Sequence, residues 1–133
     1  MAFVKFTETG KSFAPKASLN DRGYLSFNNG ARKRFNIDKY EYAVLYNDAE
    51  NRKIGVEFTN EASAEGAVKL RVRQTGATIG AKSFIDFFDI KISKTTIYDV
   101  SQGDSPQWVI IDLATGRERN TKDDEEDDGS DLA

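Results

Sequence analysis

The stretch Ala67-Val-Lys-Leu-Arg-Val-Arg-Gln-Thr-Gly76 alternates apolar and basic residues with a period of two. Successive side chains of an extended chain point to opposite faces, so this pattern predicts a β-strand. The apolar residues at 68, 70 and 72 share one face. Because a half-buried antiparallel strand turns its apolar face to the core, the outer face would carry three cations in a row: Lys69, Arg71 and Arg73.

The same period predicts strands along most of the chain. Asn28-Asn29-Gly30 supplies a cap before a short helix over Ala31–Asn36, with Ala31 and Phe35 facing inward. Apolar residues at 81, 84, 85 and 88 mark one face of a second helix over Ala81–Ile90. Gly76–Gly80 is predicted as a loop that leads into this helix. The other predicted strands are Phe3–Thr7, Lys16–Leu19, Tyr24–Phe27, Lys39–Tyr46, Arg52–Thr59, Thr96–Val100 and Trp108–Leu113.

These elements predict an α+β fold, in which a curved antiparallel β-sheet with a ββββα core is closed by a helix. A chain of 133 residues is long enough for one domain with a buried core and too short for two. We expect a single β-rich domain over residues 1–122 and a separate tail over residues 123–133.

Charge is divided unevenly between these two parts. The net charge is −3, but the segment Asp123–Ala133 alone holds seven acidic residues and no basic one. The first 122 residues therefore carry all nineteen Lys and Arg against fifteen Asp and Glu, a net charge of +4. A segment as polar as the tail cannot bury enough surface to fold, so it is predicted to be disordered. It either keeps the protein in solution or competes, as a tethered polyanion, for a cationic surface of the body.

The residue types that are missing argue against an enzyme. The chain has no Cys and no His, which removes thiol nucleophiles, zinc–thiolate sites and the usual general base at neutral pH. Asp86, Asp89 and Lys91 loosely match the carboxylate spacing of metal-dependent nucleases, but that motif belongs on strands and these residues fall on a predicted helix. We expect no catalytic residue, no metal site and no cofactor.

The three cations of the opening stretch have two interpretations. They are either the solvated side of a strand or part of a surface for single-stranded nucleic acid, where cations neutralise phosphates and unpaired bases stack on aromatic rings. Nearby tyrosines can supply the rings or pack in the core instead. Strand register decides between these cases, and one sequence leaves it open. The predicted DNA-binding residues are Tyr24, Arg32, Lys33, Arg34, Tyr42, Tyr46, Arg52, Lys53, Lys69, Arg71, Arg73 and Lys82.

The antiparallel strands followed by Gly76-Ala-Thr-Ile-Gly-Ala-Lys-Ser-Phe84 and its helix resemble the transcription coactivator family called positive cofactor four and the related Whirly proteins. Thr78-Ile79-Gly80 takes the place of the family's lead into the helix, and Phe84 that of its aromatic residue. The resemblance spans about Lys16–Ile90. It implies a homodimer, formed through this helix, whose basic and aromatic sheets bind unwound DNA. The predicted dimer interface is Phe84, Ile85, Phe87, Phe88 and Trp108.

The tail adds to what the resemblance implies. With Leu132 just beyond its acidic run, it is similar to the tails of bacterial and phage single-stranded-DNA-binding proteins. This implies a phage protein of DNA replication, recombination or transcription, whose partners are single-stranded DNA, a second copy, and replication or transcription proteins that meet the tail. The sequence contains no run of about 20 apolar residues, so no membrane partner is expected. The predicted location is the cytoplasm, that of the host cell if the protein is phage-encoded.

Two other interpretations stay open. Asp21–Ile37 is similar to the strand, short helix and strand of AbrB-type regulators, which bind duplex DNA as dimers, but it lacks the Pro that usually opens that helix. A protein–protein adaptor, whose acidic tail docks on a basic partner, is the second alternative. Tighter binding of a single strand than of a duplex would separate the single-stranded-DNA-binding hypothesis from both alternatives.

Overall fold

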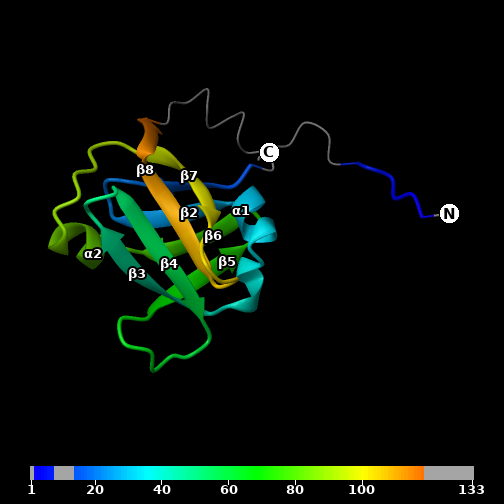
Figure 1. Ribbon diagram of the computed structural model, residues 1–133, viewed down its shortest axis with the longest axis horizontal. Helices are drawn as coiled ribbons and strands as arrows, with labels where there is room; N and C mark the ends of the chain where they lie inside the picture. Colours follow the sequence, from blue (N-terminus) through cyan, green and yellow to red (C-terminus); the bar gives the residue numbers. More distant parts are fainter. Residues whose placement is uncertain (1, 8–13, 119–133) are drawn as a thin grey trace.

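The computed structural model of the chain describes residues 2–7 and 14–118. Within these residues, eight strands join into one closed antiparallel barrel in the order β1-β2-β6-β5-β3-β4-β8-β7 (Figure 1). Closing a sheet on itself leaves it without unprotected edges. The strands are β1 (Lys16–Leu19), β2 (Tyr24–Asn28), β3 (Tyr42–Asp48), β4 (Lys53–Thr59), β5 (Val68–Arg73), β6 (Gly76–Gly80), β7 (Thr96–Gln102) and β8 (Trp108–Glu118).

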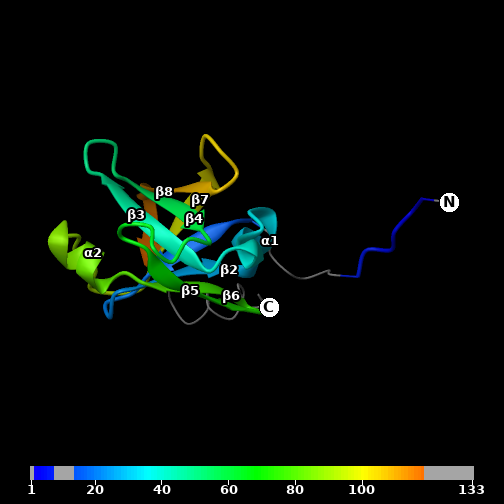
Figure 2. The same cartoon turned by 90° about the horizontal axis from the view of Figure 1, so that it is seen from below.

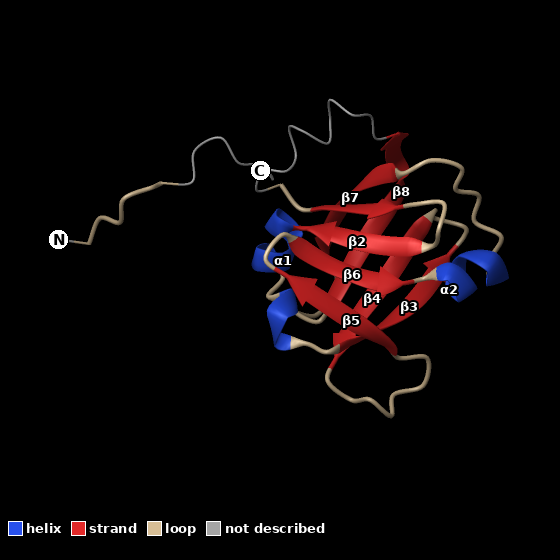
Figure 3. Ribbon diagram, turned by 180° about the vertical axis from the view of Figure 1, so that it is seen from behind, coloured by secondary structure: helices blue, strands red, loops and turns tan. Residues whose placement is uncertain are grey.

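Strand order decides which strands share a wall of the barrel. β2, β6 and β5 lie side by side in one wall, with β1 next to β2 (Figure 3). In the order of the ring, β2 and β6 stand opposite β4 and β8. Seen from below, β5 and β6 form one side of the barrel while β7 and β8 form the other (Figure 2).

The interior of the barrel is filled by side chains of the alternating apolar residues. Phe27 of β2 meets Phe58 of β4 edge-on, with ring centroids 5.7 Å apart, although these strands stand on opposite walls. Both side chains are only 2% exposed. An eight-stranded barrel leaves an interior just wide enough for such side chains, and their burial supplies the main driving force for folding.

Two short helices lie at opposite ends of the barrel (Figures 1 and 3). The first, α1 (Asn29–Arg34), begins where the Asn28 side chain accepts a hydrogen bond from the backbone N–H of Ala31 at 2.8 Å. Ala31 and Phe35 are buried, as predicted. A 3-10 turn, η1 (Ile37–Lys39), leads from α1 to β3. The second helix, α2 (Lys82–Phe87), follows β6 directly and buries Ile85.

The predicted α+β fold with a ββββα core and a closing helix is wrong, because the described chain forms an eight-stranded barrel with only two six-residue helices. The decisive difference concerns Gly76–Gly80, which is not the predicted loop but strand β6, paired with both β2 and β5. A Cβ on Gly76 would lie 2.2 Å from the carbonyl oxygen of Phe27. This glycine, which directly follows the turn at Gln74 and Thr75, therefore also lets two backbones approach closely.

Most other predicted elements are present with shifted ends. The strands predicted at 16–19, 24–27, 52–59 and 96–100 are confirmed within two residues. The strand predicted over Lys39–Tyr46 begins only at Tyr42, after the 3-10 turn, and β8 continues to Glu118. The predicted strand Phe3–Thr7 is wrong, because residues 2–7 form no strand. The tail over residues 123–133 lies outside the described residues.

None of the helices in the described part of the chain has the length and apolar character that crossing a membrane requires.

We predict that Gly76→Ala destabilises the protein by at least about 1–3 kcal/mol, since it strains the backbone at a φ of +151° and forces the contact with Phe27. Gly80→Ala is the matched control in the same strand. A Cβ there meets nothing within 4 Å, so a change within about 0.5 kcal/mol is expected. Urea unfolding followed by circular dichroism measures both variants, and equal losses in the two would contradict this role of Gly76.

Candidate nucleic-acid interface

The cations of β5 lie on the outside of the barrel, as the alternation predicted. Leu70 is buried at 4% exposure, whereas Lys69, Arg71 and Arg73 are exposed. The apolar side of the strand is less buried than expected, because Val72 is 39% exposed. None of the three cations forms an ion pair with a carboxylate of residues 2–7 or 14–118.

Strand register, which the sequence left open, brings tyrosines into line with these cations. Lys69 of β5 stands opposite Tyr42 of β3, and its amino group lies 5.3 Å from the centre of the Tyr42 ring, a cation–π contact. On the other side of the wall, Tyr24 of β2 stands opposite Gly80 of β6. The ring of Tyr24 is 46% exposed.

A row of outward-facing residues in register crosses β1, β2, β6 and β5 of the same wall. Ser18 of β1 pairs with Ser26 of β2, Ser26 pairs with Thr78 of β6, and Thr78 pairs with Arg71 of β5. The hydroxyl oxygens of Ser26 and Thr78 are 3.4 Å apart. Three hydroxyl side chains thus form the floor between β1 and the cations of β5.

The outer face of this wall is hollowed. Two adjoining hollows share Asn20, Arg22, Ser26, Arg73 and Thr78 in their linings, and we call them together the basic groove. Tyr24, Lys69 and Arg71 line one hollow, and Lys16 and Ser18 line the other. No carboxylate of the described chain lines either one. A groove with several cations, no carboxylate in its described lining and one open ring has the features that bind a polyanion with planar groups.

Some lining residues are not among the predicted site residues. Arg22 and Lys16 line the groove, but the sequence indicates only that Arg22 lies in the turn before β2 and that Lys16 lies in a strand. In the structure, Lys16 also forms an ion pair with Asp99 of β7. The hydroxyl floor did carry a signal. Ser18, Ser26 and Thr78 each stand between two buried apolar residues of a short strand, so each side chain must face outward.

Arg32 of the predicted run on α1 serves the fold. Its guanidinium pairs with Asp38 at 2.8 Å, donates to the side-chain oxygen of Asn29 at 2.9 and 2.7 Å, and donates to the carbonyl of Gln74 at 3.2 Å. It thereby ties α1 to the turn between β5 and β6. Lys33 and Arg34 are exposed on the helix and line neither hollow of the groove.

Three more predicted cations lie outside the groove. Arg52 and Lys53 belong to the β3–β4 hairpin, on the side of the ring away from β2 and β6, and Lys53 stands in register with both Asp48 and Asp112. Lys82 of α2 pairs with Asp86 at 2.9 Å. This pair, and the pair between Lys91 and Asp89 at 2.8 Å, occupy the residues that loosely match the nuclease spacing.

Tyr46 lies on the outside of β3, next to Trp108 of β8, with ring centroids 4.6 Å apart. The indole ring lies over Gly55 of β4, where a Cβ would come within 3.0 Å of it. The Tyr46 hydroxyl donates to a carboxylate oxygen of Glu57 at 2.8 Å. This bond, together with the nearby negative charge, raises the pKa of the Tyr46 phenol. Tyr46 thus belongs to a wall with acidic neighbours and lines neither hollow.

The residues of the predicted dimer interface do not form one surface. Ile85 is buried in the protein's own core, Phe84 is partly buried against it, and Trp108 packs on Tyr46. Phe87 and Phe88 are 81% and 42% exposed at the end of α2. Only these last two rings are freely accessible to a second copy, and dimerisation stays a prediction.

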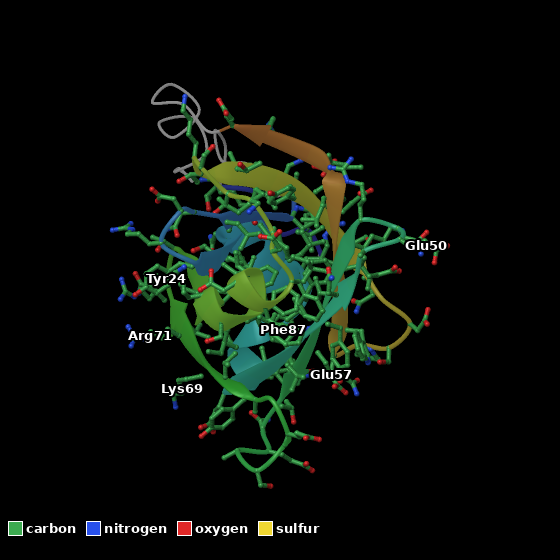
Figure 4. The ribbon with its side chains drawn as sticks, turned by 90° about the vertical axis from the view of Figure 1, so that its left-hand side faces the viewer. Tyr24, Glu50, Glu57, Lys69, Arg71 and Phe87 are labelled. Carbon is green, nitrogen blue, oxygen red and sulfur yellow. The ribbon has the colours of Figure 1, made fainter. Side chains whose placement is uncertain are left out.

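Figure 4 shows where four charged residues and two aromatic residues lie on the barrel. Tyr24, Arg71 and Lys69 lie along one side, Glu50 and Glu57 lie on the other, and Phe87 of α2 lies between the two. The overall charge of −3 therefore does not describe the surface that a ligand would meet. A polyanion approaching the barrel is attracted to the side that carries Lys69 and Arg71.

No known family model, curated protein or solved structure matches this chain. The resemblance to the positive cofactor four and Whirly families therefore stays a prediction, as do the phage origin and the cytoplasmic location. The geometry of the groove is the basis on which a function can be proposed.

We predict that Arg32→Ala lowers the free energy of unfolding by about 1–2 kcal/mol, because it removes the hydrogen bonds to Asn29 and Gln74 and the partly exposed ion pair with Asp38. Arg34→Ala removes the same charge from an exposed position of the same helix, so a change within about 0.5 kcal/mol is expected. Urea unfolding of the two variants is the measurement. Similar stability of both would show that the contacts of Arg32 contribute nothing.

Proposed function

We propose that this chain is a non-enzymatic protein that binds single-stranded DNA in the basic groove with little dependence on sequence. The observation that carries the proposal is the alignment of Lys69, Arg71 and Arg73 beside the exposed ring of Tyr24, in a hollow lined by no described carboxylate. The cations neutralise phosphates, and the ring accepts an unpaired base.

The exposure of the Tyr24 ring favours a single strand over a duplex as the ligand. In a duplex the bases already stack on one another, so the exposed ring of Tyr24 has no base to receive. Tyr42 acts differently, because the Lys69 amino group lies over its ring. Tyr42 therefore holds Lys69 in place beside the groove and is a positioning residue more than a stacking platform.

We predict that replacing Lys69, Arg71 and Arg73 together by Ala weakens binding to oligo-dT and lowers the slope of log K against log salt by about 2. Each phosphate contact in a single strand contributes about 0.7 to that slope. Fluorescence anisotropy with labelled oligo-dT at several salt concentrations measures it.

The triple variant with Ala at Arg52, Lys53 and Lys82 is the control, because it removes the same charge from outside the groove. Its slope is expected to change by less than about 0.7. Equal slopes in the two triple variants would remove the groove as the site. Tighter binding of an equally long duplex than of oligo-dT would instead support a duplex-binding regulator, and binding of neither would support a protein–protein adaptor.

The proposal includes a role for the acidic tail in limiting access to the groove, or in recruiting partner proteins once it is displaced. The last described residue, Glu118, stands in register with Thr96 of β7, and the neighbouring Thr95 lines the groove. The described chain therefore ends near the hollow that Lys16, Arg22 and Arg73 line. Seven negative charges tethered there compete with DNA at high effective concentration.

We predict that deleting Asp123–Ala133 tightens binding to oligo-dT, and that the difference shrinks as salt rises and screens the charges. A full-length tail with every Asp changed to Asn and every Glu to Gln is the control. If charge is the cause, it should behave like the deletion in the same titration. An unchanged Kd in the deletion would leave only partner recruitment or solubility as roles for the tail.

A further inference from the structure

Base-binding grooves for single strands are normally floored by aromatic rings. The basic groove has a different floor. Between the cations of β5 and the strand β1, the outward positions of β6 and β2 hold Gly76, Thr78, Gly80, Ser26 and Asn28, with a single ring, Tyr24, at one end. Bases turned toward this floor would lie on hydroxyls and bare backbone, so they would gain little stacking.

We infer, on the basis of the proposed function, that the groove takes the sugar–phosphate backbone of the strand as its ligand. The bases point away from the protein, except for one that stacks on Tyr24. Hydroxyl side chains suit this orientation because each can donate a hydrogen bond to a phosphate oxygen. Ser26 and Thr78 lie 3.4 Å apart in the middle of the floor, in the row that ends at Arg71.

The glycine at position 80 adds a second, independent observation. Gly80 stands opposite Tyr24, and a Cβ built on it meets no atom within 4 Å. The space beside the Tyr24 ring is therefore open. One nucleotide fits there with its base on the ring and its phosphate directed toward the β5 cations.

The floor and the ring make separate contributions that can be measured apart. An abasic strand, made of the sugar–phosphate backbone alone, keeps every contact to the cations and hydroxyls and loses only stacking. The probe is therefore an abasic strand compared with oligo-dT of equal length, titrated against the full chain at one fixed salt concentration.

We expect the wild-type chain to bind the abasic strand more weakly than oligo-dT by the same factor by which Tyr24→Ala weakens oligo-dT binding, about 5- to 150-fold for one stacked base. In Tyr24→Ala, the two strands should bind alike, within about threefold. Tyr46→Ala is the matched control. Tyr46 has a similar exposure, 43% against 46%, but lies outside the groove, so the difference between the strands should persist.

The hydroxyl floor has its own test. The double variant Ser26→Ala and Thr78→Val should weaken oligo-dT and the abasic strand by the same factor, about 3- to 100-fold if both hydroxyls contact the backbone. Circular dichroism and urea unfolding check that the double variant is folded. The single variant Thr78→Ser, which keeps the hydroxyl, should bind both strands as tightly as the wild-type chain.

The outcomes separate the two proposals. The Tyr24→Ala variant is the decisive case. If it binds oligo-dT more than about tenfold more tightly than the abasic strand, further bases contact the protein. The inference is then overturned, while the proposed function stands. An unchanged affinity in the folded double variant would also overturn it. If oligo-dT does not bind the wild-type chain at all, the proposed function itself fails.

Discussion

The contact between Phe27 and Phe58 across the barrel interior is the constraint on which the rest of the structure depends. These rings come from strands on opposite walls and are almost fully buried. Because side chains alternate along a strand, an inward Phe27 turns Tyr24, Ser26 and Asn28 outward. The composition of the outer surface is therefore set by the requirement to fill the inside.

The same requirement separates the charges. Leu70 is drawn into the core, so its neighbours Lys69 and Arg71 must face water, where a cation is readily solvated. In Figure 4, Lys69 and Arg71 lie on one side of the barrel and Glu50 and Glu57 on the other, although only β3 separates β5 from β4 in the ring. A chain with a net negative charge thereby presents a positive surface to a ligand. Local fields of this kind steer binding more than net charge does.

Glycines have a particular role in this barrel. Gly76 lets β6 approach β2, and Gly55 lets the Trp108 ring lie against β4. Gly55 is inside β4 and Gly76 is the first residue of β6, and a glycine in a strand tends to indicate a close approach of other atoms. The pattern Gly-Ala-Thr-Ile-Gly predicts a loop because glycine is more often found in turns. Without β6 as a strand, β2 and β5 have no common neighbour, and the closed wall that carries the groove cannot be foreseen.

The sequence by itself determined which residues of each strand face outward, because period-two alternation is a local property of the chain. The outward direction of Lys69, Arg71 and Arg73, the cap at Asn28 and the burial of Phe35 all follow from such local patterns. Only the tertiary structure decided which outward residues meet. Register and strand order bring Lys69 to Tyr42 and the row of hydroxyls to Arg71, and they send Tyr46, Arg52 and Lys53 elsewhere. The reason is physical: pairing between strands far apart in sequence is chosen by how all the inward side chains pack together, and no single segment contains that information.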